Sequence, residues 1–300
     1  MPSVRSCPYR HNRHHNATDT MLAGRTAIIT GAGRGIGAAA ALAFGRQGAR
    51  VVINDLDAAE AEASAVAVRA AGGEAIAFGG SVTDSAFPDA IVAATLETYG
   101  TPDIIVNNAG FLWDGVLHNQ SDKQFEEILS VHLTAPFRLV RAAAPHMRGA
   151  AKAELEHGGQ PRDRAIINVS STSGLHGNVG QANYAAAKAG ITGLTKTLAK
   201  EWGPVGVRAN AIAFGMIDTR MTNAFADTGA VRVDGEEIPQ GLPEHVAKMW
   251  SDNSQMLKMI VPLARKGTVD EAAGGMLFLA SPLASYVTGH TLEVTGGFGI

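Results

Sequence analysis

The chain has 300 residues and a formal net charge of −3, a balance that gives no general attraction to nucleic acid or to an anionic membrane surface. A single cysteine, Cys7, excludes internal disulfides and favours a reducing compartment, and no apolar run approaches the ~18 residues that span a bilayer. We therefore expect a cytoplasmic protein with neither nucleic acid nor membrane as a partner. Glycine is in excess, at 35 residues, which predicts tight turns or close approach of the backbone to a ligand.

The first 20 residues have no apolar periodicity, and they lack the apolar stretch of a secretory signal. His11, His14 and His15 cluster there, and either a metal site or an unstructured segment would suit them. We expect residues 1–20 to be a disordered leader and to bind no metal, since terminal tails are usually not held in place. Whether these residues are translated, or whether the chain starts at Met21, stays open.

From Arg25 onwards, short β-branched runs alternate with alanine-rich segments of helical period. The predicted strands are Thr26–Thr30, Arg50–Asp55, Glu74–Phe78, Asp103–Asn107, Ala165–Ser170, Val207–Ile212 and Thr291–Val294. The predicted helices are Ile36–Gln47, Ala58–Ala71, Ser85–Tyr99, Ser121–Gly149 (broken near Thr134–Pro136), Tyr184–Trp202 and Val269–Ala280. Strands that are apolar on both faces, each followed by a helix, predict one α/β domain over residues 21–300. Its core would be a doubly wound parallel sheet of about seven strands with helices on both faces.

Two segments interrupt this alternation. Residues 150–164 are rich in charge and are expected to form a solvated surface insertion. Residues 218–262 are rich in methionine and aromatic side chains. Such adaptable apolar side chains suit a substrate lid beside the strand ends, and they equally suit the ordinary packing of two amphipathic helices.

A glycine-rich turn, T-G-A-G-R-G-I-G at residues 30–37, joins the first strand to the first helix. Glycines there let the backbone approach a pyrophosphate, which then meets the free N–H groups at the helix N-terminus. The glycine spacing differs from G-x-G-x-x-G, so the turn alone is a weak signal. If the turn binds the pyrophosphate of a dinucleotide cofactor, the residues expected to contact it are Gly31, Gly33, Arg34, Gly35, Ile36 and Gly37.

Asp55 closes the second predicted strand, where a carboxylate can accept hydrogen bonds from an adenosine ribose. A 2′-phosphate there would meet like charge, so Asp55 favours NAD over NADP. Arg34 favours the opposite choice, because it could pair with that phosphate. We expect NAD, with NADP as the alternative, since an arginine can turn into solvent.

Tyr184 and Lys188 lie at i and i+4, on one face of a predicted helix. An ammonium beside a phenol stabilises the phenolate and would lower the tyrosine pKa towards the working pH. Ser171, after the fifth predicted strand, could hydrogen-bond the same substrate oxygen, or it could be a turn or cap residue.

Taken together these residues resemble the short-chain dehydrogenase/reductase family, over about Leu22 to Ile300. The resemblance rests on the glycine turn, N-N-A-G at 107–110, Ser171 with Y-A-A-A-K at 184–188, and the ending V-T-G-H-T-L-E-V-T-G-G. It implies a Rossmann-type NAD(P)-binding domain in which Tyr184 is the acid/base, Lys188 also holds the nicotinamide ribose, and Ser171 orients the substrate oxygen. It further implies cofactor contacts from Asn108, Ala109, Gly110, Gly215, Ile217 and Thr219.

The chain departs from the family pattern at three positions. His132 stands where the family has a catalytic asparagine, and it could anchor a water of the proton relay, titrate near neutral pH, or be a buried structural residue. Ser81 replaces an aspartate that contacts adenine, so that contact would pass to Val82. Phe214 replaces a proline, and we expect it to narrow or reshape the nicotinamide end of the site.

Within the family, V-V-I-N-D-L-D at 51–57, V-H-L at 131–133 and G-N-V-G-Q-A-N-Y at 177–184 look most like 3-hydroxyacyl-CoA dehydrogenase domains and 3-oxoacyl-carrier-protein reductases. The resemblance implies an NAD-dependent oxidoreductase acting on a 3-hydroxyacyl/3-oxoacyl thioester or a similar hydrophobic alcohol or ketone. The alternatives are an NADPH-dependent 3-oxoacyl-carrier-protein reductase and an inactive cofactor-binding regulatory protein. A homotetramer or dimer is expected, as is common in the family.

Overall fold

The computed structural model describes residues 20–225, 229–233, 235–251 and 255–299. The expectations for the leader, including its three histidines and Cys7, lie outside the described residues. None of the helices that the structure describes is both long enough and apolar enough to span a bilayer.

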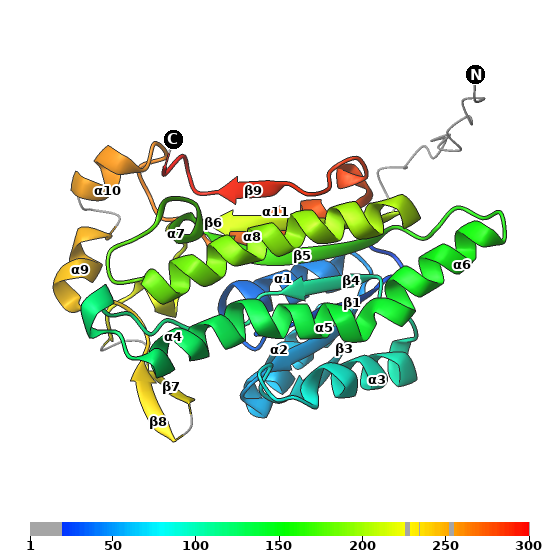
Figure 1. The fold of residues 1–300 in the computed structure, drawn as a ribbon, viewed down its shortest axis with the longest axis horizontal. Helices are drawn as coiled ribbons and strands as arrows, with labels where there is room; N and C mark the ends of the chain where they lie inside the picture. The colour runs from blue at the N-terminus through cyan, green and yellow to red at the C-terminus, as the bar shows by residue number, and fades with distance from the viewer. Residues whose placement is uncertain (1–19, 226–228, 234, 252–254, 300) are drawn as a thin grey trace.

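Seven parallel strands form the central sheet, in the order β3-β2-β1-β4-β5-β6-β9 (Figure 1). Their bounds are β1 (Thr26–Ile29), β2 (Arg50–Asp55), β3 (Glu74–Gly79), β4 (Ile104–Asn107), β5 (Arg164–Ser171), β6 (Val207–Phe214) and β9 (Thr291–Val294). β1, β4 and β6 are buried along their whole length, which is why their sequences are apolar without alternation. The prediction of a doubly wound parallel sheet of about seven strands is confirmed.

Helices cover both faces of this sheet and bury a separate apolar cluster on each. One cluster joins the sheet to α1 (Gly35–Arg46), α2 (Ala58–Ala70) and α11 (Val269–Ala280). The other joins it to α3 (Phe87–Tyr99), α5 (Ala135–Ala144) and α8 (Ala182–Trp202), of which α5 and α8 are in front of the sheet in Figure 1. The strand order reverses between β1 and β4, so the loops at their carboxyl ends diverge and leave a crevice there.

The long helical segment after β4 runs through its expected break near Thr134–Pro136. α4 (Asp122–Leu129) passes into a π-helical turn at Ser130–Thr134, then α5, a second π-turn at Pro145–Gly149, and α6 (Ala150–Glu156). Proline has no N–H to donate within a helix, and a π-helical turn, which is wider than an α-helical turn, allows the helix to continue without that hydrogen bond. Pro136 follows the first π-turn and Pro145 begins the second, so the helix widens at these places and continues.

The charged segment 150–164 is not simply a solvated insertion. Arg164 has a side chain that is only 1% exposed, and its guanidinium makes hydrogen bonds of 2.9 and 2.7 Å to both carboxylate oxygens of Glu154 on α6. Asp163 accepts from Arg25 and from Arg208, both at 3.1 Å. These charges therefore form ion pairs at the amino-terminal ends of the strands, and the pair of Arg164 with Glu154 attaches α6 to the sheet.

The segment 218–262 contains more than two amphipathic helices. An antiparallel hairpin, β7 (Ala230–Val233) and β8 (Glu236–Pro239), precedes the short helices α9 (Glu244–Met249) and α10 (Gln255–Ile260). Alternation of Val231, Arg232 and Val233 with the buried Ile238 opposite fits a two-stranded ribbon with one apolar face. A run of only four residues between loops is too short for reliable detection from sequence.

Asp163→Asn should destabilise the fold, because it leaves the guanidinium groups of Arg25 and Arg208, with side chains 9% and 8% exposed, without their shared countercharge. We expect a loss of about 3 kcal/mol in the free energy of unfolding, at the low end for a broken buried pair since Asp163 is partly exposed. Urea unfolding measures it. Lys152→Ala, which removes an exposed pair with Glu156, is the control; equal losses in the two variants would contradict the assignment.

Candidate active site

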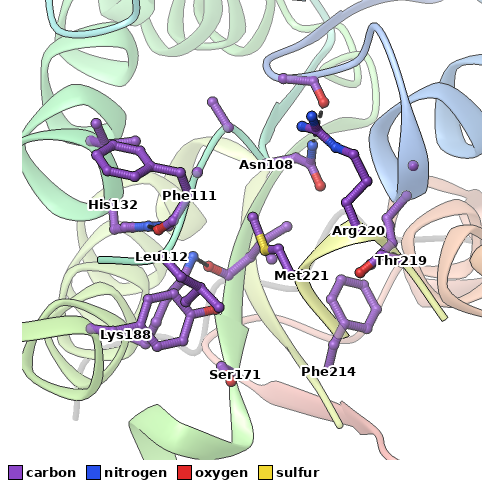
Figure 2. Close-up of a pocket in the computed structure, with 18 of the residues that line it drawn as sticks. Asn108, Phe111, Leu112, His132, Ser171, Lys188, Phe214, Thr219, Arg220 and Met221 are labelled. Carbon is purple, nitrogen blue, oxygen red and sulfur yellow. Dashed lines mark hydrogen bonds between the residues drawn. The ribbon is translucent and has the colours of Figure 1, made fainter. Parts of the chain in front are cut away.

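One cavity of about 1530 Å³ opens at the carboxyl ends of the strands. Its walls come from the glycine turn, the loops after β3, β4, β5 and β6, helix α8, and the segment 218–262 (Figure 2). The predicted lid segment does line this cavity, through Thr219, Val231, Val246 and Trp250 among others. The crevice expected from the strand order and the observed cavity are the same place.

The glycine turn is shaped for close approach of a phosphate group. A Cβ on Gly31 would lie 2.6 Å from the Cα of Ala109, whereas a Cβ on Gly35, at φ +58°, would meet nothing within 4 Å. Helix α1 then begins at Gly35 without a side-chain cap and without an acidic residue in its first turn. Its leading N–H groups are therefore available to an anion, and the turn fits the pyrophosphate of a dinucleotide.

Asp55 ends β2 at the rim of the turn. Its Oδ2 accepts from the backbone N–H of Gly33 at 2.9 Å, and its Oδ1 accepts from that of Asp57 at 3.2 Å. A Cβ on Gly33 would lie 2.7 Å from Asp55 Oδ2, so only glycine fits there. Arg34 pairs with Glu60 at 3.0 Å and lies 3.9 Å from Asp57. Three carboxylates thus surround the place expected for the adenosine ribose, and two of them engage Arg34.

The remaining residues predicted near the adenosine line the same cavity. Ser81 shares a hydrogen bond of 2.8 Å with the Thr83 hydroxyl, which keeps its side chain within a local turn beside Val82. The side-chain amide of Asn108 donates to the carbonyls of Thr30 and Gly31, at 3.0 and 2.8 Å. Asn108 therefore holds the glycine turn in shape from across the crevice.

Ser171, Tyr184 and Lys188 all line the cavity and lie next to one another; Ser171 and Lys188 are labelled in Figure 2. Ser171, at the end of β5, hydrogen-bonds the Tyr184 side chain and also accepts from the N–H of Ser173, capping the short helix α7 (Thr172–His176). The cap role that the sequence left open is therefore present, and the contact with Tyr184 places the hydroxyl beside the proposed acid/base. Lys188 Nζ lies 5.5 Å from the centre of the Tyr184 ring and donates to the carbonyl of Val169 at 2.7 Å.

Burial is the largest cause of the pKa shifts of Tyr184 and Lys188. It raises the pKa of Tyr184 to about 12, against the Ser171 hydrogen bond, which lowers it, and with a further rise from the Asp114 charge. Burial also lowers the pKa of Lys188 to about 7. The direction for Tyr184 is opposite to that expected from the i, i+4 spacing, because desolvation of the phenolate is the largest cause of the shift.

His132 is buried against Tyr184, with the two rings edge to face at 5.1 Å. Its Nε2 lies 2.9 Å from the carbonyl of Phe111, which can only accept, so Nε2 carries the proton. Burial, together with the charge of Lys188, holds its pKa well below the usual value. His132 is therefore neutral rather than a group that titrates near neutral pH. A Cβ on Gly110 would overlap its ring, which explains the glycine at that position.

The loop after β6 supplies the far wall of the cavity. Gly215 packs against the backbone of Thr295, and Ile217 is buried and bridged to Gly267. Thr219 begins a short 3₁₀ turn at Arg220–Thr222, where its side chain accepts from the backbone N–H of Thr222. The Thr222 hydroxyl in return accepts from the backbone N–H of Thr219 at 3.1 Å. Phe214 is buried at the end of β6 and also lines the cavity.

Three cavity residues were missed in the sequence. Asp114 accepts from the Gln181 side chain at 2.9 Å, and burial raises the pKa of its carboxyl. Arg220 reaches from the loop after β6 into the cavity (Figure 2), where burial and the charge of Arg34 lower its pKa. The three residues are thus Asp114, Gln181 and Arg220. The positions of two of them could have indicated a place in the site, since Gln181 precedes Tyr184 by about one helical turn and Arg220 follows Thr219 directly.

The chain matches models of known families over most of its length. Residues 25–229 match the model described as short chain dehydrogenase, and residues 241–299 match one described as enoyl-(acyl carrier protein) reductase.

Individual proteins agree with these matches. A 3-oxoacyl-[acyl-carrier-protein] reductase of Synechocystis is 36% identical over 93% of this chain and 98% of its own length. An uncharacterized oxidoreductase of Mycobacterium bovis is 39% identical over the same shares. Among solved structures, a mutant of a Serratia marcescens short-chain dehydrogenase/reductase superposes with a TM-score of 0.75 at 30% identity, covering 93% of this chain and 100% of that one.

The lowered pKa of Lys188 predicts a pH dependence of stability. Between pH about 7 and its ordinary value of 10.5, the unfolded chain binds a proton that the folded chain lacks, so stability rises with pH across this window. Lys188→Met should flatten that rise in the free energy of unfolding, measured by urea titration at several pH values. Lys196→Met, at an exposed site on the same helix, is the matched control. An unchanged slope for Lys188→Met would contradict a partly neutral Lys188.

Proposed function

The chain belongs to the short-chain dehydrogenase/reductase family and is an oxidoreductase that binds NAD(P), and we propose that it uses NAD to interconvert a 3-hydroxyacyl and a 3-oxoacyl thioester. The observation that carries the proposal is the convergence of Ser171, Tyr184 and Lys188 on one cavity with the glycine turn. The bound dinucleotide would supply the hydride acceptor or donor, held by the glycine turn, Asp55 and the loop after β6.

Tyr184 is proposed as the group that moves a proton to or from the substrate oxygen. Its phenol stays protonated at neutral pH, so it is ready as a proton donor when a ketone is reduced. The Ser171 hydroxyl, already hydrogen-bonded to Tyr184, would hold the same substrate oxygen. Lys188 can gain or lose a proton near neutral pH and lies beside the Tyr184 ring, which suits it to hold the proton that restores the phenol; it would also hold the ribose of a bound cofactor. His132, neutral and packed on the Tyr184 ring, would fix the orientation of that ring.

The preference for NAD rests on the charge around the ribose site. Asp55 accepts from the glycine turn through Oδ2 and from the N–H of Asp57 through Oδ1, and Arg34 pairs with Glu60 and lies near Asp57. A 2′-phosphate would have to displace Arg34 from these carboxylates and approach Asp55 as well, at a cost in like-charge repulsion. An NADPH-dependent 3-oxoacyl-carrier-protein reductase is the second candidate, favoured by the names of relatives such as the Synechocystis enzyme. Initial rates with both cofactors separate the two.

The thioester class rests on the relatives named 3-oxoacyl-[acyl-carrier-protein] reductase and on the apolar lining of the substrate half of the cavity. Val231, Val246 and Trp250 line that half and offer an apolar surface to an acyl chain. A protein that binds cofactor without turnover is the remaining alternative, and it would show cofactor binding with no oxidation of any alcohol.

A homotetramer or dimer in the cytoplasm is proposed as well. Phe125 on α4 and Phe137 on α5 are 38% and 44% exposed on the helices that flank the middle of the sheet, and Tyr286 near β9 is fully exposed. Apolar surface of this kind is typical of interfaces between copies.

Tyr184→Phe should lower kcat by about 10²–10⁴-fold, because the variant keeps the ring but lacks the proton that it transfers. Its affinity for NAD, measured by calorimetry, should stay unchanged. Tyr286→Phe, at a fully exposed tyrosine, is the control. Substantial turnover by Tyr184→Phe would rule out the proposed mechanism.

Asp55→Ala should raise kcat/KM for NADP relative to NAD by about tenfold or more, since it removes the carboxylate that opposes a 2′-phosphate. Glu62→Ala, an exposed carboxylate of α2 outside the cavity, serves as the comparison. If the ratio is the same in both variants, Asp55 does not select the cofactor.

A further inference from the structure

The side chain of Gln240 joins the segment 218–262 to the loop after β4. Gln240 is 1% exposed, and its Oε1 accepts from the N–H of Leu112 at 3.1 Å while its Nε2 donates to the carbonyl of Leu112, also at 3.1 Å. Its Nε2 donates further to the carbonyls of Ile238 and Pro239. One buried amide thus pairs with a backbone unit 128 residues away, as a neighbouring strand would.

This amide holds the β7–β8 hairpin against the apolar cluster around Tyr184. Ile238 is buried in that cluster with Phe111, and Val231 and Val233 pack against it from the same face of the hairpin. Both valines also line the cavity. The inner face of the hairpin is therefore continuous with the surroundings of the tyrosine.

The loop to which Gln240 binds is fixed at several other points. The carbonyl of Phe111 accepts from His132, and Asp114 accepts from Gln181. The N–H of Gly115 donates to the carbonyl of Gly180 at 2.8 Å. A segment fastened to this loop shares its rigidity, so the hairpin is attached to the same backbone that positions His132 against Tyr184.

We propose that Gln240 is a positioning residue whose hydrogen bonds to Leu112 hold the β7–β8 hairpin in place, which we call the lock. The hairpin then forms a fixed wall of the substrate half of the cavity. This wall limits the length of the apolar chain that a substrate can carry beside its reacting carbon. The substrate class in this proposal rests on the proposed function; the lock does not. Removing the amide leaves the N–H and C=O of Leu112, which are partly buried, without these partners, a state that costs free energy until water enters or the hairpin moves away.

Amide hydrogen exchange tests the lock without any substrate. In Gln240→Met, which keeps the length of the side chain but neither hydrogen bond, we expect the Leu112 amide and the hairpin amides to exchange at least about tenfold faster. Glu237→Gln, which breaks the exposed pair with Arg232 on the same hairpin, should leave them unchanged. Unchanged exchange of Leu112 in Gln240→Met would overturn the proposal.

Kinetics test the wall. With 3-oxoacyl N-acetylcysteamine thioesters of short, medium and long chain, Gln240→Met and the pair Val231→Ala/Val233→Ala should each raise kcat/KM for long relative to short chains by about tenfold. The dissociation constant for NAD should not change. Equal losses at every chain length would show a purely structural role and overturn the proposal. If the wild-type protein reduces none of these thioesters, the proposed substrate fails, whereas the exchange experiment still decides the lock.

Discussion

The hydroxyl of Thr30 connects the two loops on which the site depends. It accepts from the backbone N–H groups of Asn108 and Ala109, both at 3.1 Å, while Asn108 returns two hydrogen bonds to the glycine turn. β1 and β4 are neighbours in the sheet, and their loops diverge at the point where the strand order reverses. These bonds keep the turn and the loop in register across the crevice, so that the walls that both supply belong to one cavity.

Burial decides the protonation states in that cavity more than any pair of neighbours does. Tyr184, Lys188 and His132 are all shifted towards their neutral forms, and desolvation is the largest cause for each. A phenol that keeps its proton and a lysine that titrates near pH 7 suit a reaction in which a proton enters and leaves the site. The neutral His132 adds no charge, and its ring packs on Gly110 and Tyr184 instead.

Most of the sheet and the glycine turn followed from sequence pattern, because buried parallel strands are apolar without alternation and their period differs from that of helices. The hairpin β7–β8 and the buried Arg164 did not follow. The hairpin strands have only four residues each. From the sequence alone, Arg164 is expected to be a surface charge, and only the structure shows that α6 places Glu154, ten residues earlier, opposite it. Both depend on partners that local pattern does not identify.

The sequence by itself determined the doubly wound sheet, the family and the candidate Ser171, Tyr184 and Lys188, since each rests on local spacing or on a strand-to-helix transition. Tertiary structure alone decided the direction of the Tyr184 pKa, the neutrality of His132, the engagement of Arg34 by Glu60, and the attachment of the hairpin through Gln240. The physical reason is that solvation and contacts between distant segments set these properties. A linear spacing of residues states neither how deeply a group is buried nor which backbone it meets.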